Sequence, residues 1–148
     1  APEVSDELMR ECGEKENIYL AEHGGSLFEG EIETLEILAR SIPRGMYIVS
    51  NCQTGYIESF YSGNGLGKYF FDQECQGNTG LSKAENIRLV IERNSLRSPV
   101  FIGDTDSDRK AAKESGVPFI HAAYGFGESI EGDCIACSFP DILNALDL

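Results

Sequence analysis

The chain is poor in positive charge and carries no sign of a membrane segment. Its 148 residues include 12 Lys and Arg against 25 Asp and Glu, a formal net charge of −13. A field of that sign repels the phosphates of nucleic acids and anionic membranes, so neither is an expected partner. A membrane-spanning helix needs about 20 apolar residues, and no run approaches that length. A ligand that carries phosphate must therefore be bound by local cations.

The sequence also lacks a signal-peptide pattern, a starting methionine and a disulfide pattern. Its cysteines are odd in number and irregularly spaced, so we expect reduced thiols and a cytoplasmic protein. One C-x-x-C pair spans residues 134–137, inside a predicted strand, where positions three apart point to opposite faces. A zinc site is therefore not expected there. The five cysteines are Cys12, Cys52, Cys75, Cys134 and Cys137.

An acidic run, residues 103–108, is the most informative segment. It follows the apolar residues 100–102, which predict a buried parallel strand that ends at Gly103. Ligands of open α/β sheets bind at the carboxyl ends of such strands. Clustered carboxylates repel one another unless a cation lies between them, so the run predicts a Mg²⁺ site with oxygen ligands. An EF-hand loop is excluded, because Arg109 and Ser115 stand where that loop needs Gly and Glu.

Hydrophobic periodicity predicts one domain in which strands and helices alternate from residue 46 onward. Such alternation is typical of a right-handed, mostly parallel sheet. Residues 3–22 predict one or two helices with a break near Gly13. The expected helices cover residues 31–40, 53–61, 109–115 and 140–146, with one more starting at Ser82; the expected strands cover 46–49, 69–72, 100–103, 119–123 and 134–137.

The glycine-rich residues 63–68 look like a nucleotide-binding motif but fail its requirements. A phosphate-binding P-loop would need Gly at Ser62 and Ser or Thr at Tyr69, and a dinucleotide fingerprint needs a different spacing after a strand. We therefore expect a loop that ends a helix.

Three further features favour a phosphoryl site. Ser50 ends a predicted strand and offers a hydroxyl beside backbone N–H groups. Ser82 begins a capping box, which places Lys83 in the first helical turn. The helix dipole disfavours a cation there, so a bound anion explains the position of Lys83 better than a solvated surface does. Together with Asp104 and Asp108, these groups suit phosphoryl chemistry.

These segments resemble known motifs. Residues 49–51, Lys83 and residues 103–108 resemble motifs two, three and four of the haloacid dehalogenase-like hydrolases. Residues 123–127 resemble the phosphoglycolate phosphatase-like branch of that superfamily. The resemblance covers residues 30–148 and implies an α/β fold, a Rossmann-like three-layer parallel core over residues 31–148. Residues 1–30 are then expected to be the remnant of an α-helical cap.

The resemblance implies a Mg²⁺-dependent phosphatase of small phosphorylated metabolites that acts through an aspartyl-phosphate. In that scheme Ser50 and Asn51 bind the phosphoryl group, and Lys83 steadies both nucleophile and phosphate. Asp104 ligates Mg²⁺, and Asp108 orients the metal or its water. Asp106 has no such role and is expected to cap a helix.

One departure from the family pattern is large. The first motif, Asp-x-Asp-x-Thr or Val after an initial strand, carries the nucleophilic Asp and is absent. In the family this strand lies between the strand that ends at Ser50 and the one that ends at Asp104. Strands pair about 4.8 Å apart, so its omission leaves a gap of about twice that distance. We expect a chain that is a fragment, rearranges or borrows a strand, and that is inactive by itself.

Two alternatives remain open. One is a non-catalytic interaction module that keeps the fold without the nucleophile. The other is a receiver-like signalling domain, which also combines acidic residues, Ser or Thr, Lys and Mg²⁺. Receivers place the acidic cluster first and the Lys last, whereas this chain has the order Ser50, Lys83, Asp104.

Overall fold

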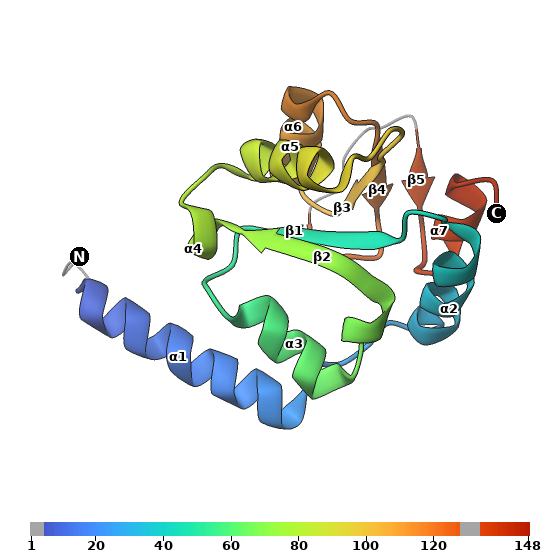
Figure 1. Cartoon of the computed structure of the whole chain (residues 1–148). Helices are drawn as coiled ribbons and strands as arrows, with labels where there is room; N and C mark the ends of the chain where they lie inside the picture. Colours follow the sequence, from blue (N-terminus) through green and yellow to red (C-terminus); the bar gives the residue numbers. More distant parts are fainter. Residues whose placement is uncertain (1–4, 128–133) are drawn as a thin grey trace.

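The computed structural model describes residues 5–127 and 134–148. Strands and helices alternate from β1 onward, as the periodicity predicts (Figure 1). The elements are α1 (Asp6–His23), α2 (Glu31–Ser41), β1 (Met46–Ser50), α3 (Tyr56–Asn64), a 3-10 turn (Gly67–Tyr69), β2 (Phe70–Cys75), α4 (Gln76–Thr79), α5 (Lys83–Asn94), β3 (Phe101–Gly103), α6 (Asp106–Ser115), β4 (Phe119–Ala122), β5 (Ile135–Ala136) and α7 (Asp141–Ala145).

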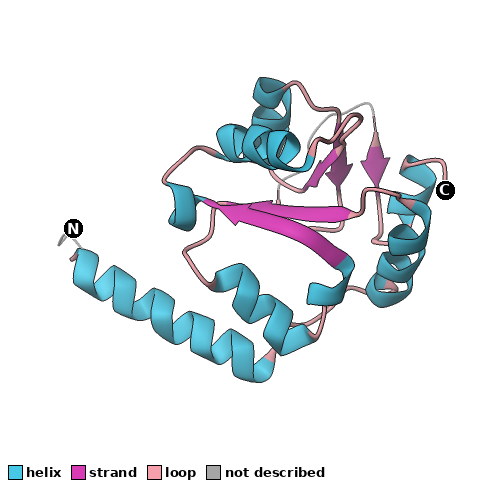
Figure 2. Ribbon diagram, viewed as in Figure 1, coloured by secondary structure: helices cyan, strands magenta, loops and turns pink. Residues whose placement is uncertain are grey.

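The strands form two separate parallel sheets rather than one (Figure 2). β1 pairs with β2, and the second sheet has the order β3-β4-β5. No ladder within the described residues joins β1 to β3. The parallel α/β architecture is therefore confirmed, and β1 and β3 do not pair directly, in keeping with the expected gap between them.

Helices on both faces hold the two sheets together. On one face, α5 lies over β1 and β2 while α6 lies over β3 and β4 (Figure 1). The two helices share a buried cluster of Ala84, Ile87, Ala111 and Val117, against which Val49 of β1 and Phe101 of β3 pack. On the opposite face, Met46 of β1 and Ile102 of β3 pack against a cluster of Leu38, Ile120, Ala136 and Ile142. Both sheets thus share their hydrophobic layers without sharing hydrogen bonds.

The first helix lies outside these layers. α1 runs along α3 and buries none of its own residues (Figure 1). Its main polar anchor is Asn17, whose Nδ2 donates to the carbonyl of Thr54 at 2.8 Å. The predicted break near Gly13 is wrong, because a glycine inside an exposed helix costs only about 1 kcal/mol relative to Ala. None of the helices described is long and apolar enough to cross a membrane.

Other boundaries follow local chemistry. The helix expected over 53–61 begins at Tyr56 and ends at Asn64, where Gly65 adopts a left-handed conformation and stops it. The glycine-rich segment is thus a helix-ending loop, as predicted. The short α4 was missed, since four residues carry no periodic pattern.

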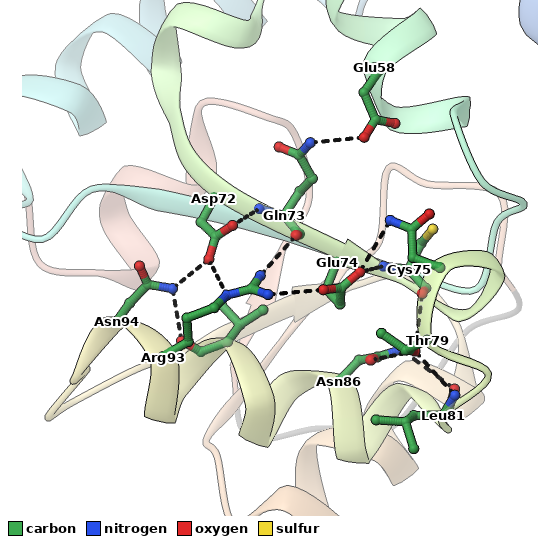
Figure 3. A network of polar contacts seen from close by, with 12 residues as sticks. Glu58, Asp72, Gln73, Glu74, Cys75, Thr79, Leu81, Asn86, Arg93 and Asn94 are labelled. Carbon is green, nitrogen blue, oxygen red and sulfur yellow. Dashed lines mark hydrogen bonds and ion pairs between the residues drawn. The ribbon is translucent and has the colours of Figure 1, made fainter.

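The outer strand β2 is tied to α5 by a polar network (Figure 3). Arg93 donates to Asp72 at 2.8 Å, to Glu74 at 3.0 Å and to the carbonyl of Gln73 at 3.1 Å. Asn94 donates to Asp72 at 2.7 Å. Burial alone would raise the pKa of Asp72 and Glu74, but these hydrogen bonds outweigh it and lower both pKa values. The network satisfies the polar groups that the strand presents to α5.

Candidate phosphoryl site

The predicted site residues gather where two strands end and two helices begin. Ser50 is the last residue of β1, Asp104 follows β3, and Lys83 opens α5. Asp108 lies in the first turn of α6. This end of the molecule therefore combines strand carboxyl ends with helix N-termini, an arrangement that favours anions.

Two capping boxes set the helix starts. At α5, the Ser82 hydroxyl accepts from Glu85 N and the Glu85 carboxylate accepts from Ser82 N, as predicted. At α6 the equivalent pair is Thr105 and Asp108. The expectation that Asp106 caps this helix is wrong: Thr105 is the N-cap, because its side chain reaches the N–H three residues on. Asp106 instead pairs with Arg109 and Lys110 on the surface.

The centre of the site is a buried ion pair between α5 and α6. Lys83 Nζ lies 2.5 Å from Asp108 Oδ1, with the two side chains 15% and 7% exposed. The other carboxylate oxygen accepts from Thr105 N at 3.1 Å and from its hydroxyl at 2.7 Å. Burial alone would raise the pKa of Asp108, but the bonds from Lys83 and Thr105 outweigh it and lower that pKa. Asp108 is therefore ionised and holds Lys83 in place.

Close packing explains Gly103 before the acidic run. A Cβ added to Gly103 would lie 2.5 Å from Cβ of Asp108, a distance that real Cβ atoms do not reach. Any larger residue would push Asp108 away from Lys83.

Asp104 is held by the loop that follows β4, the strand next to β3. Its Oδ2 accepts from the backbone N–H groups of Phe126, at 2.7 Å, and Gly127, at 3.0 Å. A Cβ on Gly127 would lie 1.9 Å from the Asp104 carbonyl oxygen, so the loop approaches too closely for a side chain. Among the described residues both bonds fall on Oδ2, which leaves Oδ1 for another ligand.

Ser50, the last residue of β1, and the three residues after it form the 50–53 turn, in which Asn51 lies at a pocket that Lys83 also lines. Cys52 N donates to Ser50 Oγ at 3.2 Å, and the Cys52 carbonyl accepts from Gly77 N at 3.0 Å. A pocket of about 320 Å³ brings Asn51 together with Lys83, whereas Ser50 and Asp104 are not among its lining residues. The remaining lining residues are Gln76, Ser82, Ala84, Ser107, Lys110, Ala111 and Glu114.

Sequence reasoning missed four polar residues of this pocket: Gln76, Ser107, Lys110 and Glu114. Ser107 lies inside the acidic run but was given no role of its own. Lys110 lies one helical turn after Asp106, and that spacing on α6 was the available signal.

A larger cleft, of about 770 Å³, opens between the two sheets. Residues 46–49 of β1 form one wall. Residues 100–102, which include the first two residues of β3, form the other. Ile87, Val90 and Ile91 of α5 line it from one face, and Leu38 and Ile142 from the opposite face. The cleft is thus apolar on both faces and bordered by two strand edges.

Within the described residues, no group of three or more His, Cys, Asp and Glu side chains is placed to hold a metal ion. Asp104 retains one oxygen for a hard cation such as Mg²⁺. Both oxygens of Asp108 are already engaged, one with Lys83 and one with Thr105. These residues thus offer one free carboxylate oxygen to a hard cation, which is only part of the ligand set that Mg²⁺ needs.

Solved structures with the same architecture identify the class of fold. A haloacid dehalogenase-like family hydrolase from Streptococcus pneumoniae matches 98% of this chain and 72% of its own, with a TM-score of 0.79 and 23% identity. A HAD-superfamily hydrolase from Ehrlichia chaffeensis matches 94% of this chain and 68% of its own, with a TM-score of 0.63 and 26% identity. The fold is therefore that of the haloacid dehalogenase-like superfamily, as the motifs predict.

Sequence relatives narrow the likeness to one branch. The chain is 30% identical over 152 residues to the phosphoglycolate phosphatase of Shigella boydii and 32% identical over 140 residues to that of Escherichia coli K12. These alignments cover 95% and 87% of the chain but 59% and 54% of the relatives, so the chain spans little more than half their length. No protein-family model matches it. The predicted resemblance to haloacid dehalogenase-like, phosphoglycolate phosphatase-like proteins is confirmed.

Proposed function

We propose that this chain carries the phosphate-binding and metal-binding part of a Mg²⁺-dependent phosphatase for small phosphorylated metabolites. The observation that carries the proposal is the buried Lys83–Asp108 pair beside the Asn51 pocket. A buried lysine whose carboxylate partner is held by two further hydrogen bonds is oriented before any ligand arrives. Such preorganised positive charge stabilises a transferring phosphoryl group.

The roles follow from what each side chain can still do. Ser50 Oγ has a hydrogen to donate while it accepts from Cys52 N, and Asn51 is exposed at the pocket. Lys83 can donate two further hydrogens beside its bond to Asp108, since an ammonium has three. Ser50, Asn51 and Lys83 would hold the phosphoryl oxygens. Asp104 would ligate Mg²⁺, and Asp108 would act by fixing Lys83. Bound Mg²⁺ would neutralise charge on the phosphoryl group.

We propose that the chain is inactive by itself, because its sequence has no counterpart of the family's first motif, which carries the nucleophilic Asp. We infer that this Asp enters on an apolar strand placed in the cleft between β1 and β3. Two features support the position: strand edges border the cleft on both sides, and both of its faces are apolar. A parallel strand buried on both faces is a continuous apolar run, so the entering segment should be one.

A complementation assay tests the function. The chain is mixed with a synthetic peptide of five Val and Ile residues followed by Asp-x-Asp-x-Thr, and phosphate release from a small phosphate ester is measured with Mg²⁺. We expect no turnover by the chain alone and turnover with the peptide. A peptide with Asn in place of its first Asp, and Lys83→Ala in the chain, should each abolish it.

Three results would contradict the proposal. Turnover by the chain alone above the Lys83→Ala level would mean that the nucleophile lies within it. A peptide that binds, yet gives no phosphate release at any Mg²⁺ concentration, would favour the non-catalytic interaction module. Tight, saturable Mg²⁺ binding by the chain alone would contradict the half-formed metal site, for which we expect weak binding.

A further inference from the structure

Two cysteines lie close together, one in the 50–53 turn and one at the end of β2, although they are 23 positions apart in the sequence. Cys75 is the last residue of β2 and pairs in register with Ser50, the last residue of β1. Cys52 follows Ser50 by two residues. Cys75 is 1% exposed, whereas Cys52 is partly exposed. The Cys52 thiol can therefore be reached from solvent, whereas Cys75 is buried.

Two contacts bring the segments of the pair together. Gly77 N donates to the Cys52 carbonyl at 3.0 Å, so the turn continues the backbone contact between the two strands. The Cys75 thiol donates to the carbonyl of Gln53 at 3.7 Å, which directs it toward the turn. Cys75 also contributes to the raised pKa of the Cys52 thiol. Cys75 pairs in register with Ser50, on strands about 4.8 Å apart, and Cys52 lies two residues further on, where the Gly77 contact holds it against the end of β2.

We propose that Cys52 and Cys75 form a reversible disulfide, a redox modification site built into the turn that carries Ser50 and Asn51. The Cys52 thiolate attacks a low-molecular-weight disulfide such as oxidised glutathione, forms a mixed disulfide and releases one glutathione thiol. Cys75 then attacks the Cys52 sulfur and releases the second. The pair loses two electrons and two protons, and the reagent is reduced to two thiols.

The modification acts on the candidate site through one short connection. Cys52 N donates to Ser50 Oγ at 3.2 Å, so a bond that draws Cys52 toward β2 changes the environment of that hydroxyl. The remaining described cysteines lie elsewhere: Cys12 on α1, and Cys134 and Cys137 flanking β5. They provide internal controls for a pair-specific reaction.

The electrostatic environment of the Cys52 thiol sets the rate at which the disulfide forms. Burial raises the pKa of the Cys52 thiol, the Ser50 contact lowers it and the nearby Cys75 raises it, with a raised pKa as the net effect. Since the thiolate is the nucleophile, the disulfide should form slowly at neutral pH and faster as the pH rises. The test must therefore be read at equilibrium.

The experiment exposes the whole chain to glutathione buffers of increasing oxidised fraction, alkylates the remaining thiols and maps the peptides by mass spectrometry. We expect a Cys52–Cys75 crosslink that reverses on reduction. Cys75→Ala should instead retain glutathione on Cys52, because nothing displaces it. Cys137→Ala is the matched control and should leave the crosslink unchanged. Oxidation should also shift the amide resonances of residues 50–52 more than those of α7.

Several outcomes would overturn the proposal: glutathione that accumulates on Cys52 of the unsubstituted chain, a crosslink between other cysteines, or unchanged amide resonances at residues 50–52. If Cys75→Ala fails to fold, Cys52→Ala decides the matter, since it must abolish the crosslink while leaving the buried Cys75 unmodified. No phosphatase activity is measured, so failure of the proposed function would leave this result intact.

Discussion

The two edges of β1 differ as much as any two regions of this molecule. One edge pairs with β2, whose polar side chains are tied to α5 through Arg93 and Asn94 (Figure 3). The other edge faces an apolar cleft of about 770 Å³, beyond which lies β3. The first edge is closed by hydrogen bonds and ion pairs, whereas the second, in the part of the chain that the structure describes, is bridged by the helices above and below. Across the cleft, the Lys83–Asp108 pair is the buried polar link between α5 and α6.

Removal of the Lys83–Asp108 pair should have the largest effect on the free energy of unfolding. Asp108→Ala leaves Lys83 buried without its partner, and such a change typically costs about 3–5 kcal/mol. Chemical unfolding should show a loss of this size. Asp106→Ala on the same helix is the control, since its pairs are exposed and should contribute less than about 1 kcal/mol. Equal losses for the two variants would mean that the buried pair does not hold the halves together.

Packing along the cleft should be weaker than packing in the closed core. Ile102 and Ile120 are neighbours in the β3–β4 ladder, but Ile102 lines the cleft and Ile120 is 3% exposed in the core. We expect Ile120→Ala to cost about 2–4 kcal/mol and Ile102→Ala about 1 kcal/mol. Unfolding of the two variants under identical conditions makes the comparison. A larger loss for Ile102 would contradict an open cleft.

The closed edge of the sheet is tested by Arg93→Met, which keeps an unbranched apolar side chain and removes the charge. Asp72 and Glu74 would then lose their charged partner, and we expect a cost of about 1–3 kcal/mol because the arginine is itself 40% exposed. Arg40→Met is the matched control, since the pair of Arg40 with Glu36 is largely exposed. A loss no larger than that of the control would show that the network is only a surface feature.

The smallest effect should be a change in the dependence of stability on pH. Asp72 and Glu74 have pKa values that are lower in the folded chain. Their stabilisation is therefore complete above the unfolded values, about 3.9 and 4.3, and is lost as the pH falls through the folded values. The free energy of unfolding should fall below about pH 5, and Arg93→Met should flatten that slope. An unchanged slope in the variant would assign the acid sensitivity to other groups.

Features that depend on neighbouring residues in the sequence could be predicted. The capping box at Ser82, the apolar run before Gly103 and the acidic segment after it each predict one element start or end within a few residues. Lys83 was expected to face a bound anion, and that stays a prediction; in this structure its partner is the carboxylate of Asp108. The helix cap at Thr105 was assigned one residue too late, since Thr and Asp are both good caps and only the geometry distinguishes them.

Contacts between distant segments were beyond prediction. The residues that hold Asp104 lie 22 and 23 positions away, and Cys52 meets Cys75 only because two strands end side by side. The sequence by itself determined most strands and helices and the capping box at Ser82, because propensity and capping act over a few positions, and its resemblance to the family predicted the gap between β1 and β3. Only the tertiary structure decided that this gap is a cleft with two apolar faces, and that Lys83 pairs with Asp108. Both follow from which edges and side chains meet once the helices have packed.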